Sequence, residues 1–297
     1  MSVSSSTVRL VHRFVRLRYR PKRLNGFPLP GLVPLEVVVC LKQIPNPDLQ
    51  FQVAADGKDI RRETLNYKTN GADEYALEEA VRLKEKHGGK VTAITAGPKR
   101  TEQMLREAMA KGADAAVRLA FDDPAAIDAF QVARMLAAAI AKRPHDLVLA
   151  GVQSDDYGHS ATGPLIAGFL KIPHASVVAK VEVMEGGVKV WRELEGGDQE
   201  VVSLARPALL TIQFGINQPR YAPLPAIMKA SRQPIEEVKP EDLGQPSWDA
   251  FRGPYTLAVR RVSPPAAQGY AEMIPGKVAE QAKAVAQLLR DKGLYRG

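Results

Sequence analysis

The sequence predicts an α/β protein of the Rossmann-like class, with a mainly parallel sheet, helices on both faces and an extended C-terminal arm. Short apolar runs rich in β-branched residues alternate with segments of helical period through about residue 172. This alternation is typical of a parallel sheet covered by helices. The first run, residues 35–41, has almost no polar positions, which indicates a strand buried on both faces.

The alternating part is expected to contain four strands and four helices. The strands are the apolar runs 35–41, 90–96, 115–119 and 145–151. The first helix is expected to be capped by Asn70 or Asp73, to place its acidic residues early and its basic residues late, and to end at Gly88 and Gly89. The next three helices are expected at residues 101–111, 125–142 and 160–170.

After Pro173 the pattern changes to short β segments. Strands are expected at 176–183, 188–194 and 200–204, with glycine turns between them, and a further buried strand at 207–214. Beyond Gly215 the chain is rich in proline, and only residues 276–292 show a helical stripe again. The expected organisation is a basic disordered extension (1–34), an α/β nucleotide-binding domain (35–222) and a recognition loop with a C-terminal arm and terminal helix (223–297).

Composition limits the class of protein. The 297 residues are 45% hydrophobic and 25% charged, which is ordinary for a soluble globular protein. No apolar run is long enough to span a membrane. A single cysteine, Cys40, excludes an internal disulfide and most cysteine-based metal sites.

The formal charge of +8 is concentrated in the first 35 residues, which carry seven Lys and Arg and no acid. The remaining chain is nearly neutral, so a nucleic-acid partner is not expected. Three explanations of this extension stay open: an upstream start codon, an organelle transit peptide, or a functional arm for an anionic surface. The expected location is correspondingly the bacterial cytoplasm or, alternatively, the mitochondrial matrix.

The strongest local feature is the polar segment that follows the fourth strand and leads into a helix, residues 151–164. Ligands of open parallel sheets bind beyond the carboxyl ends of the strands. Free backbone N–H groups at the helix start, with the hydroxyls of Ser160 and Thr162, would suit a phosphate. The alternative is a plain connecting loop with Ser160 as the helix N-cap.

Other chemistry has weaker support. Asp155 and Asp156 could be read as paired carboxylates, but adjacent loop residues often point apart. His159 could act as a base, although a loop histidine more often makes a structural hydrogen bond. The sequence contains no Walker A loop, no nucleophile-elbow motif and no metal-spaced cluster of His, Cys and Glu. We therefore expect no catalytic residues, no metal and no enzyme activity of the chain's own.

Taken together, several stretches resemble the electron transfer flavoprotein beta family over about residues 35–244. They are Val38-Val-Cys-Leu-Lys42; Asn70 with Glu78-Glu-Ala-Val-Arg-Leu-Lys-Glu-Lys86; Gly97-Pro98; Lys111-Gly-Ala-Asp114; Gln131-Val-Ala-Arg134; Asp146-Leu-Val-Leu149 with 151–163; Arg192-Glu193 with Gly196-Gly197; and Asn217-Gln-Pro-Arg-Tyr-Ala222 with Leu224-Pro and Ile227-Met-Lys229. Their order and spacing, rather than any single motif, carry the resemblance.

The resemblance implies an adenine nucleotide alpha hydrolase-like variant of the Rossmann-like fold, with AMP buried as a structural cofactor. By position, the AMP shell would be Cys40, Asn70, Gly71, Ala72, Asp73, Ala96, Gly151, Val152, Gln153, Ser154, Asp155, Asp156, Tyr157, Gly158, His159, Ser160, Ala161 and Thr162. At Gly71-Ala72-Asp73 the chain departs from the family, which often has an aromatic or apolar residue and a Cys there.

The resemblance also implies partners. A beta subunit pairs with an alpha subunit that carries most of the FAD, receives electrons from flavin-dependent dehydrogenases and passes them toward a quinone oxidoreductase. Glu193 would face the alpha subunit near the flavin. Leu224, held between Pro223 and Pro225 on a stiff stretch without helical or strand period, would be the side chain that docks on dehydrogenases.

Alternatives remain at this point. Electron-splitting relatives hold a second FAD in place of AMP and tend to carry Asp-Thr-Ala-Gln where this chain has Gly158-His-Ser-Ala161. The chain is more similar to the AMP type, and to the branch with a Val-Gln-Ser-x-Asp loop, some of whose members serve amine dehydrogenases. A free-standing adenine-nucleotide sensor would not need the region after Gly215. An adenylating enzyme would need a pyrophosphate loop that the sequence lacks.

Overall fold

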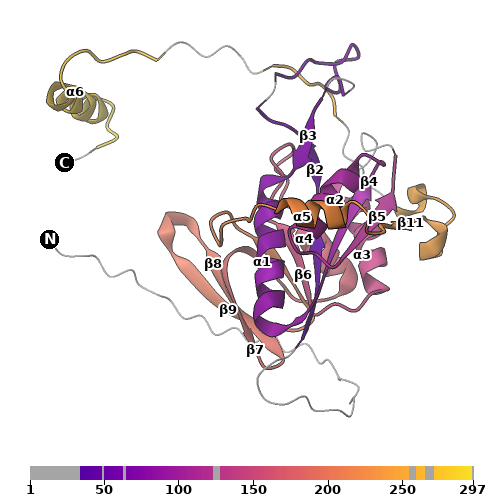
Figure 1. Cartoon of the computed structure of the whole chain (residues 1–297). Helices are drawn as coiled ribbons and strands as arrows, with labels where there is room; N and C mark the ends of the chain where they lie inside the picture. Colours follow the sequence, from indigo (N-terminus) through magenta and orange to yellow (C-terminus); the bar gives the residue numbers. More distant parts are fainter. Residues whose placement is uncertain are drawn as a thin grey trace.

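The computed structural model describes residues 34–48, 50–62, 65–122, 128–253, 259–264 and 271–295. Of the basic extension predicted at 1–34, residues 1–33 lie outside the described residues. A nine-stranded sheet runs through the main body in the order β11-β5-β4-β1-β6-β10-β7-β8-β9 (Figure 1). Every neighbouring pair from β11 to β7 is parallel, and β8 and β9 add two antiparallel pairs at one edge. The predicted α/β class with a mainly parallel sheet is confirmed.

The strands of this sheet follow the apolar runs of the sequence. They are β1 (Leu35–Cys40), β4 (Gly89–Gly97), β5 (Ala115–Ala120), β6 (Leu147–Gly151), β7 (His174–Met184), β8 (Gly187–Glu193), β9 (Gln199–Ala205), β10 (Ala208–Ile212) and β11 (Glu236–Val238). A separate antiparallel pair consists of β2 (Gln43–Pro45) and β3 (Tyr67–Thr69). The short strands β2, β3 and β11 were not predicted, because three residues carry too little periodicity to stand out from a loop.

Helices cover both faces of the sheet. Those packed with its strands are α1 (Gly71–His87), α2 (Thr101–Ala110), α3 (Ala129–Ala141), α4 (Thr162–Leu170) and α5 (Leu224–Ala230). A further helix is α6 (Val278–Asp291). Alternate residues of β1 point to opposite faces. Val37 and Val39 pack in the core layer under α1 and α2, whereas Val38 and Cys40 pack in the layer under α3 and α4.

Two helix starts differ from the sequence-based expectation, and a third agrees in position but not in its capping contact. The helix expected from residue 125 begins at Ala129, where the Asp128 carboxylate accepts a hydrogen bond from the Gln131 N–H (2.8 Å). The helix expected from residue 160 begins at Thr162, and Ser160 is not its N-cap. Asn70 does occupy the N-cap position of α1, but its side chain makes no capping hydrogen bond.

The region after Gly215 contains a helix that the proline pattern concealed. Leu224 was expected on an extended stretch, but it is the first residue of α5, with Pro223 at the N-cap. The expectation was wrong because proline is well tolerated in the first turn of a helix, where its missing N–H has no intrahelical partner.

The terminal helix expected at 276–292 is present as α6. Figure 1 shows it away from the sheet, and none of its residues is buried.

Candidate functional site

Three segments that the sequence singled out meet at one edge of the sheet. Because β1, β4 and β6 are parallel neighbours, their carboxyl ends lie together: Cys40 ends β1, Ala96 is next to last in β4, and Gly151 ends β6. The start of α1 at Gly71 lies against the segment that follows β6. The structure therefore brings the residues of the implied AMP shell into one neighbourhood.

Asn70 ties the start of α1 to the segment 151–162. Its side-chain amide donates to the Gln153 carbonyl (2.9 Å) and its side-chain oxygen accepts from the Asp155 N–H (3.0 Å). The Asn70 backbone N–H donates to the Lys42 carbonyl (2.9 Å). The side chain is buried, so each of these bonds replaces one with water. The Asn70 side chain thus holds the loop in place, although the residue itself occupies the N-cap position of α1.

Asp73 makes a second link at the same place. Its carboxylate accepts from the backbone N–H of Lys42 (2.7 Å) and from that of Gly151 (2.9 Å). Desolvation by burial raises the pKa of Asp73 to about 7, against the lowering effect of these two hydrogen bonds. Asp73 therefore joins the ends of β1 and β6 through a carboxyl group that titrates near neutral pH.

Close packing at Gly151 leaves no room for a side chain. A Cβ atom there would lie 2.4 Å from the Asp73 Oδ1 and 2.7 Å from the Ala72 Cβ. Gly163, in the first turn of α4, is similarly close to Thr211, with 2.5 Å to its Cγ2. The two glycines allow α1 and β10 to approach the segment that connects β6 to α4.

Lys42 organises the exposed half of the loop. Its ammonium group donates to the Asp156 carboxylate (2.6 Å) and the Ser154 hydroxyl (3.2 Å), and lies 4.8 Å from the centre of the Tyr157 ring. Although partial burial opposes ionisation of Asp156, the charge and hydrogen bond of Lys42 hold its pKa below the usual value. The Tyr157 ring in turn stacks on His159, with centroids 5.5 Å apart. Lys42 was not among the predicted site residues, although a polar residue directly after a buried parallel strand was a signal for it.

The two adjacent aspartates do not act as a pair. The Asp155 carboxylate accepts from the Gly71 N–H (3.3 Å) at the start of α1, whereas Asp156 pairs with Lys42. Among the described residues, no group of three His, Cys, Asp or Glu side chains is placed to hold a metal ion. These separate contacts do not support the interpretation of Asp155 and Asp156 as a metal-binding or acid–base pair.

The start of α4 offers free backbone donors. In the described part of the chain, the N–H groups of residues 159–163 have no hydrogen-bond acceptor. Ser160 has a φ of 51°, which is uncommon and unfavourable for a residue with a side chain. Strain of this kind is found where surrounding contacts or a ligand hold the backbone. Consecutive free N–H groups at the positive end of a helix dipole form an anion-binding arrangement.

Cys40 and Ala96 are apolar components of this region. Cys40 is buried, and burial, followed by the nearby Asp73 carboxylate, raises the pKa of its thiol far above the usual value. A thiol that stays protonated is a poor nucleophile and a poor metal ligand. Ala96 is half-buried against the core layer under α3 and α4. Both residues present small apolar surface to the carboxyl edge of the sheet.

Glu193 and Leu224, the predicted partner contacts, form no hydrogen bond with residues 151–162 among the described contacts. Glu193 ends β8 and is exposed; its carboxylate accepts from the side-chain amide of Gln213 (2.7 Å) rather than pairing with Arg192. Leu224 is 71% exposed at the start of α5. A hollow of about 520 Å³, lined by Met228, Lys229, Arg232, Gln233 and Pro234, lies at the end of α5 and not at the loop 151–162.

The fold and the site together define the class: an α/β protein whose candidate anion site lies at the carboxyl edge of a parallel sheet, where a loop leads into a helix. Comparison with known proteins gives the family. The family model "Electron transfer flavoprotein domain" matches residues 59–243. The chain is 39% identical to the electron transfer flavoprotein subunit beta of Methylophilus methylotrophus, over 86% of this chain and 98% of that protein.

Two further relatives agree. The subunit beta of Bacillus subtilis is 35% identical over 82% of this chain and 94% of its own length, and that of Homo sapiens is 38% identical over 71% and 83%. The chain belongs to the electron transfer flavoprotein beta subunit family, and the resemblance stated from its motifs is confirmed. No helix in the described ranges is both long and apolar enough to cross a bilayer.

Proposed function

We propose that this chain is the electron-carrier subunit of a heterodimer, in which a partner alpha subunit carries most of the FAD and this subunit holds AMP as a structural cofactor. The observation that supports the proposal is the row of free N–H groups at residues 159–163, in a chain of this family whose preceding residues 151–155 are hydrogen-bonded to the start of α1. A phosphate is the ligand that such donors bind best.

The residues present fit a nucleotide. The N–H groups of 159–163 and the hydroxyls of Ser160 and Thr162 would hold the phosphate. The segment from Asn70 to Asp73, with Cys40, Ala96 and the loop from Gly151 to Gly158, would enclose the nucleoside. In this role AMP supplies packing and hydrogen bonds rather than redox chemistry, which belongs to the flavin. The chain itself needs no catalytic residue.

Electrons would then enter and leave at the surface of the complex. We propose that Leu224 docks on flavin-dependent dehydrogenases, among which amine dehydrogenases are the first to test, and that Glu193 lies against the alpha subunit near the flavin. A quinone oxidoreductase is the proposed acceptor. The exposure of both side chains supports these roles.

Co-expression with an alpha subunit, followed by denaturation of the purified complex and chromatography of the released nucleotides, tests the proposal. We expect one AMP and one FAD per heterodimer. Two FAD molecules and no AMP would instead indicate an electron-splitting flavoprotein. Absence of any nucleotide apart from the flavin of the alpha subunit would contradict the assigned site.

A further inference from the structure

The short helix α5 has one inward and one outward face. Ala226 and Ala230, four residues apart, pack against the core layer under α1 and α2. Leu224, Ile227 and Met228 point outward and are exposed, and Tyr221, just before the helix, is 95% exposed. A helix of seven residues is too short to be stable by itself. Its orientation must therefore come from contacts with the rest of the protein.

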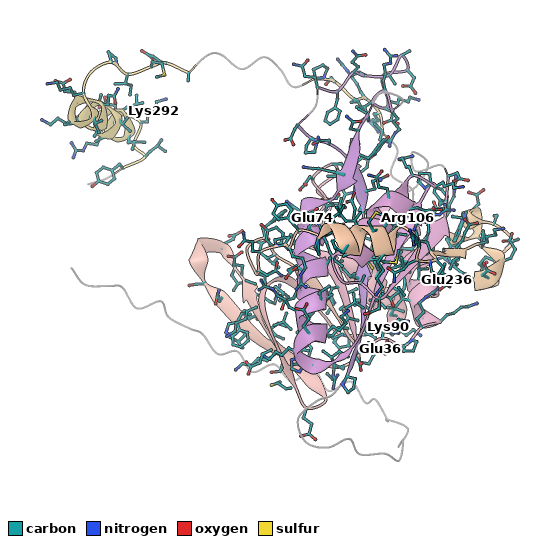
Figure 2. The ribbon with its side chains drawn as sticks, viewed as in Figure 1. Glu36, Glu74, Lys90, Arg106, Glu236 and Lys292 are labelled. Atoms are coloured by element: carbon teal, nitrogen blue, oxygen red, sulfur yellow. The ribbon has the colours of Figure 1, made fainter. Side chains whose placement is uncertain are left out.

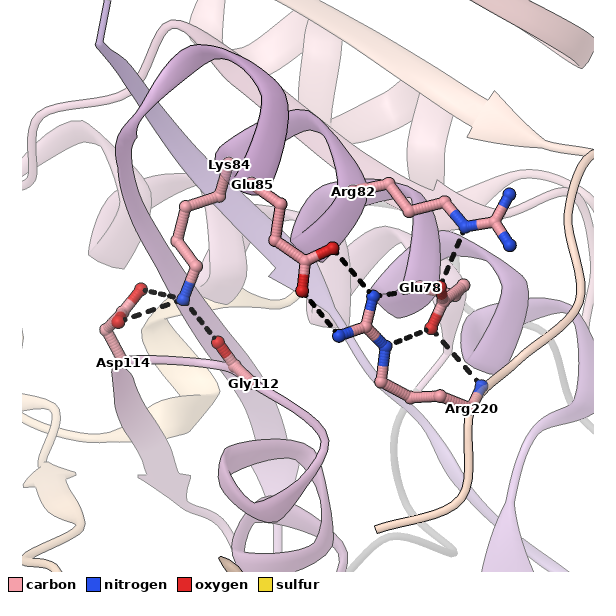
Figure 3. Close-up of polar contacts among 7 residues, drawn as sticks. All are labelled: Glu78, Arg82, Lys84, Glu85, Gly112, Asp114 and Arg220. Carbon is pink, nitrogen blue, oxygen red and sulfur yellow. Dashed lines mark hydrogen bonds and ion pairs between the residues drawn. The ribbon is translucent and has the colours of Figure 1, made fainter.

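Arg220 supplies these contacts on the N-terminal side (Figure 3). Its guanidinium group donates to both oxygens of Glu78 (2.8 and 3.1 Å) and both oxygens of Glu85 (2.6 and 3.0 Å). Its backbone N–H also donates to Glu78 (3.2 Å). Glu78 and Glu85 are two helical turns apart on the same face of α1. A planar guanidinium bound to two carboxylates has a nearly fixed orientation.

Burial makes this interaction more than a surface ion pair. The Glu78 side chain is only 4% exposed. Although its burial opposes ionisation, the hydrogen bonds of Arg220 and Arg82 hold the pKa of Glu78 below its usual value. Asn217 adds to the attachment, because its amide donates to the Tyr75 carbonyl (3.0 Å) and to Glu79 (3.1 Å). Asn217 and Arg220 thus hold the segment 217–220 against α1 through hydrogen bonds and ion pairs.

A second arginine holds the other end of α5. A guanidinium nitrogen of Arg106, on α2, lies 2.9 to 3.2 Å from the carbonyl oxygens of Ala230, Ser231 and Gln233. Figure 2 shows Arg106 beside α5. A cation at this position satisfies carbonyls that lack intrahelical partners and complements the helix dipole. The outward face of α5 is therefore supported from both ends.

We propose that Arg220 is a positioning residue for docking: it holds Tyr221, Leu224 and the outward face of α5 in the orientation that a partner dehydrogenase binds. Only three residues separate Arg220 from Leu224, and one of them is Pro223, which restricts the backbone further. A side chain that is ordered before docking loses less conformational entropy when it binds. The proposal rests on the proposed docking role of Leu224.

The test compares Arg220→Met with a control that shares its carboxylate. Arg82→Met removes the other guanidinium bound to Glu78 (2.8 Å), but Arg82 belongs to α1 itself and holds no part of the segment 217–230. In the flavin-loaded heterodimer, reduced by its dehydrogenase, we expect Arg220→Met to raise KM for the heterodimer about tenfold with kcat within twofold. Amide hydrogen exchange of residues 221–230 should speed up in Arg220→Met. Arg82→Met should change neither quantity more than twofold.

A double variant separates positioning from general stability. If Arg220 acts by orienting Leu224 and its neighbours, Arg220→Met combined with Leu224→Ala should raise KM by clearly less than the product of the two single effects. Two results would overturn the proposal while leaving the docking role of Leu224 intact. One is that the two substitutions raise KM by the full product of their separate effects. The other is that Arg220→Met speeds amide exchange in residues 221–230 but leaves KM unchanged. An unchanged KM in Leu224→Ala would overturn the docking role itself, and the positioning role with it.

Glu85→Gln keeps the test decisive if Arg220→Met does not fold. Glu85 is half exposed and removing its charge weakens one of the two carboxylate contacts, while the buried Glu78 contact remains. We expect a smaller rise in KM, about threefold, again with kcat unchanged. A folded Glu85→Gln heterodimer with wild-type KM and wild-type exchange in residues 221–230 would count against the proposal.

Discussion

The Asp73 carboxylate accepts a hydrogen bond from the backbone N–H of Gly151 at 2.9 Å, across a separation of 78 residues in the sequence. The same carboxylate accepts from the Lys42 N–H, so one side chain holds the ends of two parallel strands and the start of α1 together. This contact fixes where the loop 151–162 begins. Two predictions follow from its chemistry and its packing.

The first prediction concerns pH. The folded-state pKa of Asp73, about 7, lies above its usual value of 3.8, so the folded protein binds more protons than the unfolded one between these pH values. The contribution of Asp73 to the free energy of unfolding is therefore largest below pH 4 and falls as pH rises toward 7. Urea unfolding of wild type and Asp73→Asn at pH 5 and pH 7.5 measures it.

Asparagine retains one acceptor and carries no charge, so we expect Asp73→Asn to cost about 1–3 kcal/mol at pH 5 because one backbone donor loses its partner. The difference between wild type and variant should shrink at pH 7.5. A difference that grows with pH would show that the carboxylate form is the stable one and that the pKa is lowered.

The second prediction uses two glycines. Gly151→Ala would place a Cβ 2.8 Å from the Ala72 backbone, so we expect a loss of about 1–3 kcal/mol of stability together with loss of bound nucleotide. Gly168→Ala, in α4, meets nothing within 4 Å and should stabilise the protein by about 0.5–1 kcal/mol. Thermal unfolding and nucleotide content of both variants provide the measurement. Equal stability of the two would refute the packing argument.

The third prediction addresses the phosphate. Ser160→Gly removes the hydroxyl but tolerates the positive φ, and Thr162→Val removes the second hydroxyl without a large change of shape. Each should weaken retention of AMP by roughly ten- to hundredfold, since a hydrogen bond to a charged group contributes about 1.5–3 kcal/mol. Equilibrium dialysis of the heterodimer with AMP gives the affinity. Ser203→Ala, at an exposed position of β9, is the control and should bind as wild type.

Glu193→Ala tests the contact with the alpha subunit. If Glu193 faces a cationic group there, its removal should weaken the heterodimer by about 2–5 kcal/mol and shift the flavin potential, because truncating one member of a buried charge pair leaves the other unpaired. Analytical ultracentrifugation and a redox titration would measure these effects. Glu185→Ala, at the other end of the β7–β8 hairpin, should have neither effect. Wild-type behaviour of Glu193→Ala would place it on the solvated surface.

Leu224→Ala tests docking directly. We expect it to weaken binding to the donor dehydrogenase by about 1–3 kcal/mol, because one exposed apolar side chain can dominate a small transient interface. Steady-state reduction of the heterodimer, with AMP and flavin content measured in parallel, reports the change. Met184→Ala, the control, removes an apolar side chain of similar size that is 36% exposed at the end of β7, and should react as wild type. A loss of rate explained by lost flavin would contradict the docking role.

The sequence determined the parts of the protein that depend on local periodicity. Alternation of apolar runs and amphipathic segments predicted the class, and the long strands and helices lie within a few residues of their expected positions, because burial on one or two faces imposes a period on neighbouring residues. The polar segment after residue 151 was predicted as the candidate site because it follows a buried parallel strand. Ligands of such sheets bind beyond the carboxyl ends of the strands.

Only the tertiary structure decided the partners of individual side chains. Asn70 or Asp73 was expected to cap the first helix; Asn70 occupies the N-cap position, but its side chain bonds to residues 153 and 155 instead of to the helix. The contacts of Lys42 with Asp156 and of Arg220 with Glu78 were not predicted. Arg220 and Glu78 are 142 residues apart, and β11 joins the sheet beside β5 from a proline-rich region without clear period. Such contacts follow from which distant segments pack together, and a sequence period reports only on residues a few positions apart.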